Sequence, residues 1–261
     1  MNTKLINSFI CILTSALLHA CVTLETGQSV FMVTSVEQEK ELGEKGYEEV
    51  LAKEKISKDP AMNAVLMRVG KRIAAQANQP NFEWEFNLIE SKQLNAWCMP
   101  GGKVAVYTGI LPHMKTEAGM AVVLGHEVAH ATLRHSGQRI SQQMGLSTAL
   151  QILAGGSENK TTLMALMGVA QYGVIMPFGR KHETQADLLG LKYMARAGYD
   201  PREALEFWKR FGQATAGSSP PEFLSTHPGA DTRIKDLETH MKEAMQLYNQ
   251  TSSQYGQGQT L

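Results

Sequence analysis

The most informative segment of the chain is residues 116–135, which read TEAGMAVVLGHEVAHATLRH. Thr116 is a favourable N-cap, and the segment predicts a helix that runs through about His135. Apolar residues surround this helix on nearly every side, so we expect it to be buried. His126 and His130 are four residues apart and therefore share one face of the helix. Buried imidazoles require polar partners, and two on one face can reach a single metal ion.

Glu127 completes the pattern His-Glu-x-x-His. A carboxylate at this position can take a proton from a metal-bound water. Catalytic zinc usually has three protein ligands, so a third ligand must come from another part of the chain. A third histidine six residues after His130 is excluded, because that position is Ser136. His135 lies five residues past His130 and is expected to face elsewhere on the helix, so it is not predicted to be a ligand.

A second polar pair lies on a later predicted helix, in the segment RKHETQAD of residues 180–187. Glu183 and Asp187 are four residues apart there and share a face. Glu183 is the better candidate for the third metal ligand. The pair resembles the Glu-x-x-x-Asp element of zinc peptidases that have a glutamate ligand. That resemblance implies that Asp187 hydrogen-bonds a metal-binding histidine and orients its ring. The alternative is an ordinary solvated, charged helix face.

The rest of the chain predicts a mainly helical α+β domain over residues 36–248. Trp84, Phe86 and Leu88 alternate with polar residues, which indicates a half-buried strand. A small sheet of three or four strands is therefore expected beside the His-Glu-x-x-His helix. The predicted strands span residues 81–90, 94–98 and 103–108. The other predicted helices span residues 36–56, 61–78, 138–153, 161–173, 180–197, 201–214 and 230–248. Residues 249–261 are rich in Gln, Ser and Gly and are expected to form a disordered tail.

Residues 1–20 have the features of a secretory signal peptide. Lys4 is the only charged residue in this segment, and an apolar run from Ile6 to Leu18 follows it. The run is shorter than the about 20 apolar residues that a membrane span needs. It leads into Leu-His-Ala-Cys, which resembles a bacterial lipobox and implies cleavage and acylation at Cys21. The alternative is an ordinary secretory signal with a chance cysteine. Residues 21–35 would then link the anchor to the domain.

Cysteine usage and charge exclude other classes of function. Cys11 would leave with the signal peptide and Cys21 would carry lipid, so the mature domain would hold only Cys98 and no disulfide. The apolar neighbours of Cys98 favour an inert strand residue over a catalytic thiol. The 25 basic residues balance the 25 acidic residues without forming a basic block, which argues against nucleic acid as a partner.

Taken together, these motifs resemble metallopeptidase family forty-eight, the HtpX-like and CAAX-protease-like zinc endopeptidases. The resemblance extends from about Glu39 to Arg233. Its matching segments are Leu124–His130, Glu183–Asp187, Ser225–Pro228 with Arg233, and Asn95–Ala96 followed by Pro100–Gly102. It implies a zincin-like fold with Glu127 as the catalytic base. It also implies one Zn²⁺ per chain, held by His126, His130 and Glu183.

Further residues acquire roles only through this resemblance. His227 would lie near the metal, either to stabilise the oxyanion or to occupy the open position and keep the enzyme latent. Arg233 would order the loop of His227 by binding a carboxylate. Asn95 and Ala96 would belong to an edge strand that holds the substrate backbone by strand addition.

The smaller periplasmic lipoprotein branch of the family fits best, because the membrane-spanning helices of the integral relatives are missing. This implies a periplasmic endopeptidase that is anchored to the membrane through Cys21 and acts on misfolded or envelope proteins. Val22 after the cysteine favours the outer membrane. One alternative is a chaperone or assembly factor for outer-membrane proteins, with a latent metal site. Another is zinc-dependent hydrolysis of a non-peptide substrate.

Overall fold

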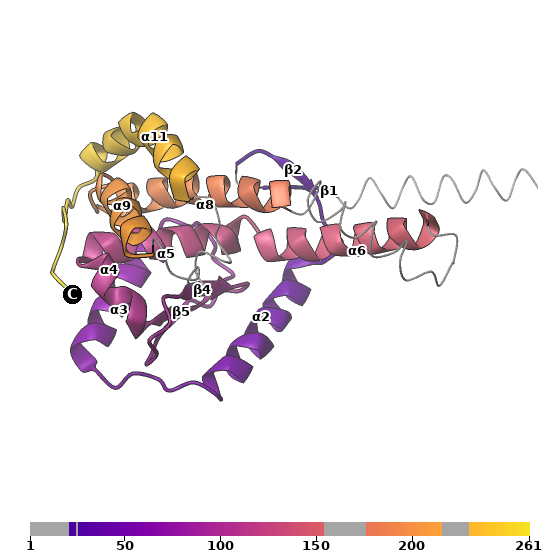
Figure 1. The fold of residues 1–261 in the computed structure, drawn as a ribbon, viewed down its shortest axis with the longest axis horizontal. Helices are drawn as coiled ribbons and strands as arrows, with labels where there is room; N and C mark the ends of the chain where they lie inside the picture. The colour runs from indigo at the N-terminus through magenta and orange to yellow at the C-terminus, as the bar shows by residue number, and fades with distance from the viewer. Residues whose placement is uncertain (1–20, 25, 154–175, 216–229) are drawn as a thin grey trace, which may run out of the picture.

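The computed structural model of the chain describes residues 21–24, 26–153, 176–215 and 230–261. Long helices enclose a small sheet, and a short hairpin lies at the start of the described chain (Figure 1). The strands are β1 (Cys21–Thr23), β2 (Ser29–Phe31), β3 (Glu85–Ile89), β4 (Ala96–Met99) and β5 (Lys103–Tyr107). The helices are α2 (Val36–Leu51), α3 (Pro60–Ala74), the 3₁₀ turn η1 (Thr108–Ile110), α4 (Leu111–Met114), α5 (Glu117–Thr132), α6 (His135–Leu153), α8 (Met176–Arg196), α9 (Glu203–Thr215) and α11 (Ala230–Gln250).

These elements confirm the predicted mainly helical α+β fold. Each predicted strand and helix within the described residues is present, with ends shifted by a few residues. The helix predicted over residues 161–173 lies outside the described residues. Within the described ranges, no helix has both the length and the apolar character needed to cross a membrane.

The three-stranded sheet has the order β3-β5-β4 and separates two apolar layers. β5 runs parallel to β3, with Val104 opposite Phe86, and antiparallel to β4. Side chains alternate along β5: Val104 and Val106 join the main core, whereas Ala105 and Tyr107 join a smaller cluster on the other face. α2 contributes to that smaller cluster, and α5 packs against β4 (Figure 1). The sheet therefore lies between α2 and the metal-binding helix candidate α5.

Local sequence determines where several helices begin. Ser35 and Gln38 form a capping box at α2, in which each side chain accepts a hydrogen bond from the other residue's backbone amide. Asp59 caps α3 by accepting from the first free amides of that helix. Thr116 caps α5 as predicted, and its hydroxyl accepts a hydrogen bond from the amide of Gly119 at 3.2 Å.

α5 is shorter than predicted, because it ends at Thr132 rather than about His135. Arg134 has a φ of 54°, a left-handed conformation that ends an α-helix, and His135 then begins α6. The guanidinium of Arg134 donates two hydrogen bonds to the carboxylate of Glu39 on α2, at 2.8 and 3.0 Å. This ion pair holds the turn between α5 and α6.

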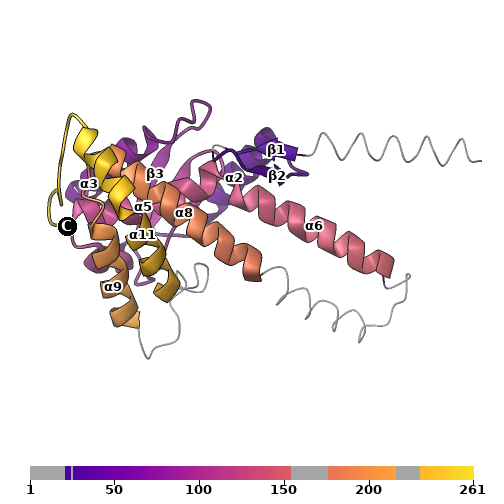
Figure 2. The ribbon, with the colours of Figure 1, turned by 90° about the horizontal axis from the view of Figure 1, so that it is seen from above.

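α5 lies at the centre of the molecule, and each of its residues is buried. α8 packs directly against it, and the two helices lie side by side in both views (Figures 1 and 2). Gly125 and Gly190 permit the close approach. A Cβ added to Gly190 would lie 2.7 Å from the carbonyl carbon of Gly125 and 2.7 Å from the amide of His126. The glycine contact brings the predicted ligands of α5 and α8 into reach of one another.

Residues 21–35 differ from the predicted linker, because they pack against the domain. β1 and β2 form an antiparallel hairpin, and both Leu24 and Met32 are buried. The amide of Val33 donates to the hydroxyl of Ser141 on α6 at 2.9 Å. Strands of three residues are too short to show a period-two pattern, so the sequence carries little sign of this hairpin.

The C-terminal residues also differ from the predicted disordered tail over 249–261. They cross the N-terminal end of α5, where the amide of Glu117 donates to the carbonyl of Gln259 at 2.9 Å and that of Ala118 to Gln257 at 3.0 Å. The first amides of a helix have no partner within the helix, so the tail supplies one. The contacts use backbone groups, which composition does not reveal.

Removal of residues 254–261 is expected to destabilise the protein. The truncation deletes five backbone hydrogen bonds that join the tail to residues 115–118 and 198–200. At about 1 kcal/mol per bond, the free energy of unfolding should fall by about 5 kcal/mol at most. Urea unfolding of the full and the truncated chain measures the change. A double substitution of Gln257 and Gln259 by Ala keeps the backbone bonds and should have a smaller effect. An unchanged midpoint in the truncated chain would show that the tail contributes no stability.

Candidate metal centre

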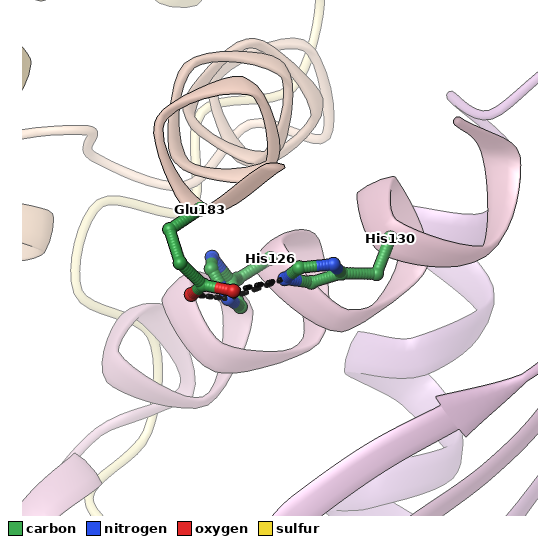
Figure 3. Close-up of side chains that lie close together, drawn as sticks. All are labelled: His126, His130 and Glu183. Atoms are coloured by element: carbon green, nitrogen blue, oxygen red, sulfur yellow. Dashed lines mark hydrogen bonds and ion pairs between the residues drawn. The ribbon is translucent and has the colours of Figure 1, made fainter. Parts of the chain in front are cut away.

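Three side chains from two helices converge at one point. Figure 3 shows His126 and His130 extending from α5 toward Glu183, which comes from α8. The Nε2 atoms of the two histidines are 2.9 Å apart, and each lies 3.4 Å from a carboxylate oxygen of Glu183. One ligand atom from each residue lies within 4.8 Å of the others. The exposed fractions of the residues are 2%, 8% and 4%. The structure thus brings together the three predicted metal ligands.

The donor set suits a divalent metal ion such as zinc. Two imidazole nitrogens with one carboxylate oxygen are a known ligand combination of catalytic zinc sites. Ligands at about 2.0–2.1 Å from a tetrahedral zinc lie about 3.3 Å from each other. The 3.4 Å separations between Glu183 and the two histidines match that spacing.

The charges around the site agree with this assignment. The carboxylates of Glu127, Glu183 and Asp187 are all buried. Among the described residues, Arg233 is the one buried guanidinium in contact with this group. The buried carboxylates thus outnumber the buried guanidinium, and this excess of acidic groups suits a cation.

Asp187, one helical turn after Glu183, orients the ring of His126. Its Oδ1 lies 2.9 Å from Nδ1 of His126. A hydrogen on Nδ1 that is donated to this carboxylate leaves the lone pair of Nε2 directed at the site. Burial and the charge of Arg233 lower the pKa of His126, but hydrogen bonds to Asp187 and Glu183 outweigh them and raise it to about 9. A proton on this ring would therefore compete with a metal ion.

Arg233 on α11 holds Asp187 in place. Its Nε and one terminal nitrogen donate to the two carboxylate oxygens of Asp187, each at 2.6 Å. Its Cζ lies 3.6 Å from the ring centroid of Trp208, a cation–π contact. Burial raises the pKa of Asp187, but the charge of Arg233 and the contact with His126 keep it below its usual value. The family resemblance implied that Arg233 binds a carboxylate and so orders the loop of His227, which lies outside the described residues. The sequence carried no signal for Trp208.

Glu127 is buried on α5, and β4 passes beside it. Burial raises the pKa of the Cys98 thiol on β4, and the negative charge of Glu127 raises it further. Cys98 is therefore a neutral thiol, in agreement with the prediction of an inert strand residue. This electrostatic influence indicates that the edge strand lies near the predicted catalytic base.

Asn95 and Ala96 lie where β4 begins. β4 pairs with β5 on one side, and no described strand pairs with it on the other. Both side chains are buried, and Oδ1 of Asn95 accepts a hydrogen bond from the amide of Ala96 at 2.9 Å. Any contact of this segment with a substrate would therefore use the backbone rather than these side chains.

Two histidines outside the predicted ligand set extend the cluster. Nδ1 of His135 lies 2.8 Å from Nδ1 of His130, and the ring of His182 stacks on His135 with a centroid distance of 3.9 Å. Burial and the charge of His182 lower the pKa of His135 to about 2, and burial lowers that of His182 to about 4. The expectation that His135 faces elsewhere is wrong, because the left-handed turn at Arg134 redirects it.

Two other residues were singled out from the sequence, His227 and Cys21. His227 lies outside the described residues, as does the segment predicted to be a signal peptide. Cys21 is exposed in β1 and makes no disulfide.

Comparisons with known proteins agree with the geometry. The sequence profile of peptidase family M48 matches residues 60–241. The mitochondrial metalloendopeptidase OMA1 of Schizosaccharomyces pombe is 34% identical over 229 residues, which cover 86% of this chain and 67% of the relative. OMA1 of Arabidopsis thaliana is 34% identical over 187 residues, which cover 70% of this chain and 37% of the relative. The beta-barrel assembly-enhancing protease of Escherichia coli K12 is 25% identical over 241 residues, which cover 88% of this chain and 49% of the relative. This chain thus spans about half or less of the latter two relatives. On its sequence, fold and metal-ligand cluster, the chain belongs to peptidase family M48.

Proposed function

We propose that this chain is a zinc-dependent metalloendopeptidase. The observation that carries the proposal is the convergence of His126, His130 and Glu183 from two helices, with the carboxylate of Glu127 next to the first ligand. Membership of a peptidase family supports hydrolysis of peptide bonds over hydrolysis of a non-peptide substrate.

A zinc ion held by His126, His130 and Glu183 would act as a Lewis acid and lower the pKa of a bound water. Glu127 takes a proton from the attacking water and passes it to the leaving amine. Asp187, held by Arg233, keeps the ring of His126 oriented with Nε2 toward the site. His227 remains a predicted neighbour of the metal, either as an oxyanion stabiliser or as a ligand that keeps the enzyme latent.

Metal analysis tests the proposed site. The purified protein is expected to hold one zinc per chain, and His126→Ala is expected to remove it, because two ligands bind weakly. Digestion of casein should stop on treatment with a chelator and return when zinc is added. His240→Ala is a matched control, because the ring of His240 on α11 hydrogen-bonds the carbonyl of Asp236 within the same helix. Zinc content that survives His126→Ala, or digestion that survives the chelator, would contradict the proposal.

The substrates are extended segments of misfolded or envelope proteins. The edge of β4 that pairs with no described strand supports this, because an added strand could hydrogen-bond its backbone near Glu127. The name of the bacterial relatives, beta-barrel assembly-enhancing protease, supports a role among envelope proteins. The mitochondrial relatives have the same domain in another compartment, so the compartment of this chain needs its own test.

In this proposal the protein lies in the periplasm, and a lipid on Cys21 anchors it to the outer membrane. The lipobox-like sequence before Cys21 and the exposure of this residue support acylation. Mass spectrometry of the mature protein should find an N-terminal Cys21 carrying acyl chains. Cys21→Ser should release the protein from membranes. A mature N-terminus at another residue would reject the anchor without affecting the proposed chemistry.

The burial of the site favours a second candidate function, a chaperone or assembly factor with a latent metal site. The three ligands have at most 8% of their surface exposed, which is compatible with a site that is closed to substrates. The two functions differ in their dependence on Glu127, since only proteolysis requires its carboxylate.

A further inference from the structure

We propose that His135 is a positioning residue that fixes the tautomer of His130, so that His130 offers the lone pair of Nε2 to the metal. The inference rests on the proposed metal site. His135 would orient His130 as Asp187 orients His126. His135 is not itself a metal ligand in this proposal.

The contact between the two rings carries the argument. Nδ1 of His135 and Nδ1 of His130 are 2.8 Å apart, which is a hydrogen-bonding distance. A single hydrogen must lie between them, because two lone pairs or two hydrogens would repel. A hydrogen on His135 would leave the neutral ring of His130 protonated at Nε2 and unable to bind metal there. A hydrogen on His130 leaves Nε2 free to coordinate.

The opposite side of the His135 ring selects between these arrangements. Nε2 of His135 and Oε1 of Gln185 are both buried without a partner at normal hydrogen-bonding distance among the described residues, and Gln185 is close enough to raise the pKa of this ring through a longer contact. The amide nitrogen of Gln185 donates to Oε1 of Gln28 at 2.6 Å, so its oxygen is the end available to His135. An oxygen can only accept, so this contact is favourable when Nε2 of His135 carries the hydrogen. Nδ1 of the neutral His135 ring is then the acceptor for His130.

The surroundings keep the ring of His135 in this position. The left-handed turn at Arg134, held by Glu39, directs His135 back toward His130. His182 stacks on the ring at an interplanar angle of 10°, and Nε2 of His182 lies 3.2 Å from Oε1 of Gln138. The ring is 1% exposed, so it is shielded from bulk water.

Two substitutions of His135 separate this role from a purely structural one. His135→Phe keeps a ring but removes the hydrogen-bond acceptor. His135→Asn keeps an acceptor, because the Oδ1 atom of asparagine takes the position that Nδ1 has in histidine. Zinc affinity, measured by competition with a chromogenic chelator on the full chain, should fall about 10- to 100-fold in the Phe variant. The Asn variant should recover most of that loss. His240→Phe is the control for histidine replacement away from the site and should leave affinity unchanged.

Nitrogen-15 NMR of the metal-free protein provides a readout independent of zinc. In the neutral form of the wild type, His130 should carry its hydrogen on Nδ1, and the Phe variant should lose this preference. A hydrogen on Nε2 in the wild type would overturn the proposal, as would a Phe variant that binds zinc like the wild type. Equal losses in the Phe and Asn variants would also overturn it. Wild-type protein that binds no zinc would instead refute the proposed metal site, whichever tautomer the NMR reports.

Discussion

Glu127→Gln is expected to remove peptidase activity and to leave zinc binding intact. The substitution keeps the size of the side chain but replaces a proton-accepting carboxylate with an amide. General-base catalysis contributes about 10²–10⁴-fold, so kcat/KM on a fluorogenic peptide should fall by that factor. His126, His130 and Glu183 are unchanged, so zinc per chain should equal that of the wild type.

Glu206→Gln is the matched control, because Glu206 is an exposed residue of α9 that pairs with Lys209 on the surface. It should retain wild-type activity. The same two variants, expressed in cells that lack the wild-type protein, separate proteolysis from a chaperone role. Full complementation by Glu127→Gln would favour the latent-site chaperone, and undiminished peptide cleavage in vitro would remove Glu127 from its proposed role.

Gly190→Ala is expected to weaken both folding and metal binding. The new Cβ would lie 2.7 Å from the backbone of Gly125 and from the amide of His126, so α8 must move away from α5. Overpacking of this kind lowers the free energy of unfolding by about 1–3 kcal/mol. Glu183 and Asp187 are both on α8, so the same movement draws them away from His126. Zinc affinity should therefore fall by about tenfold or more.

Gly212→Ala on α9 is the control, since a Cβ there would meet no atom within 4 Å. Helical Gly to Ala changes of this type stabilise by about 0.5–1 kcal/mol when space allows. Urea unfolding and chelator competition on both variants measure the contrast. If Gly190→Ala matches Gly212→Ala in both assays, the close approach of α5 and α8 does not control the site.

The residues that could be identified from the sequence are positioned by the regular geometry of a single helix or strand. His126 and His130 face the same way on any helix, and so do Glu183 and Asp187. The alternation of Trp84, Phe86 and Leu88 likewise indicated a strand, and the structure has β3 there.

The residues that sequence analysis missed depend on contacts distant along the chain. His135 meets His130 only because Glu39, 95 residues away from Arg134, holds a left-handed turn between them. The tail residues Gln257 and Gln259 cap α5 through backbone carbonyls, and a polar composition predicts disorder there because it describes side chains alone.

For this protein, the sequence by itself determined the presence of a buried helix with two histidines and an acidic residue on it, and of a second helix with a carboxylate pair. The periodicity of a helix is a local property, so these features need no knowledge of the fold. Only the tertiary structure decided that α8 lies against α5 at Gly125 and Gly190, and that Arg233 and Trp208 enclose Asp187. Such contacts depend on packing between distant segments, which no local pattern records.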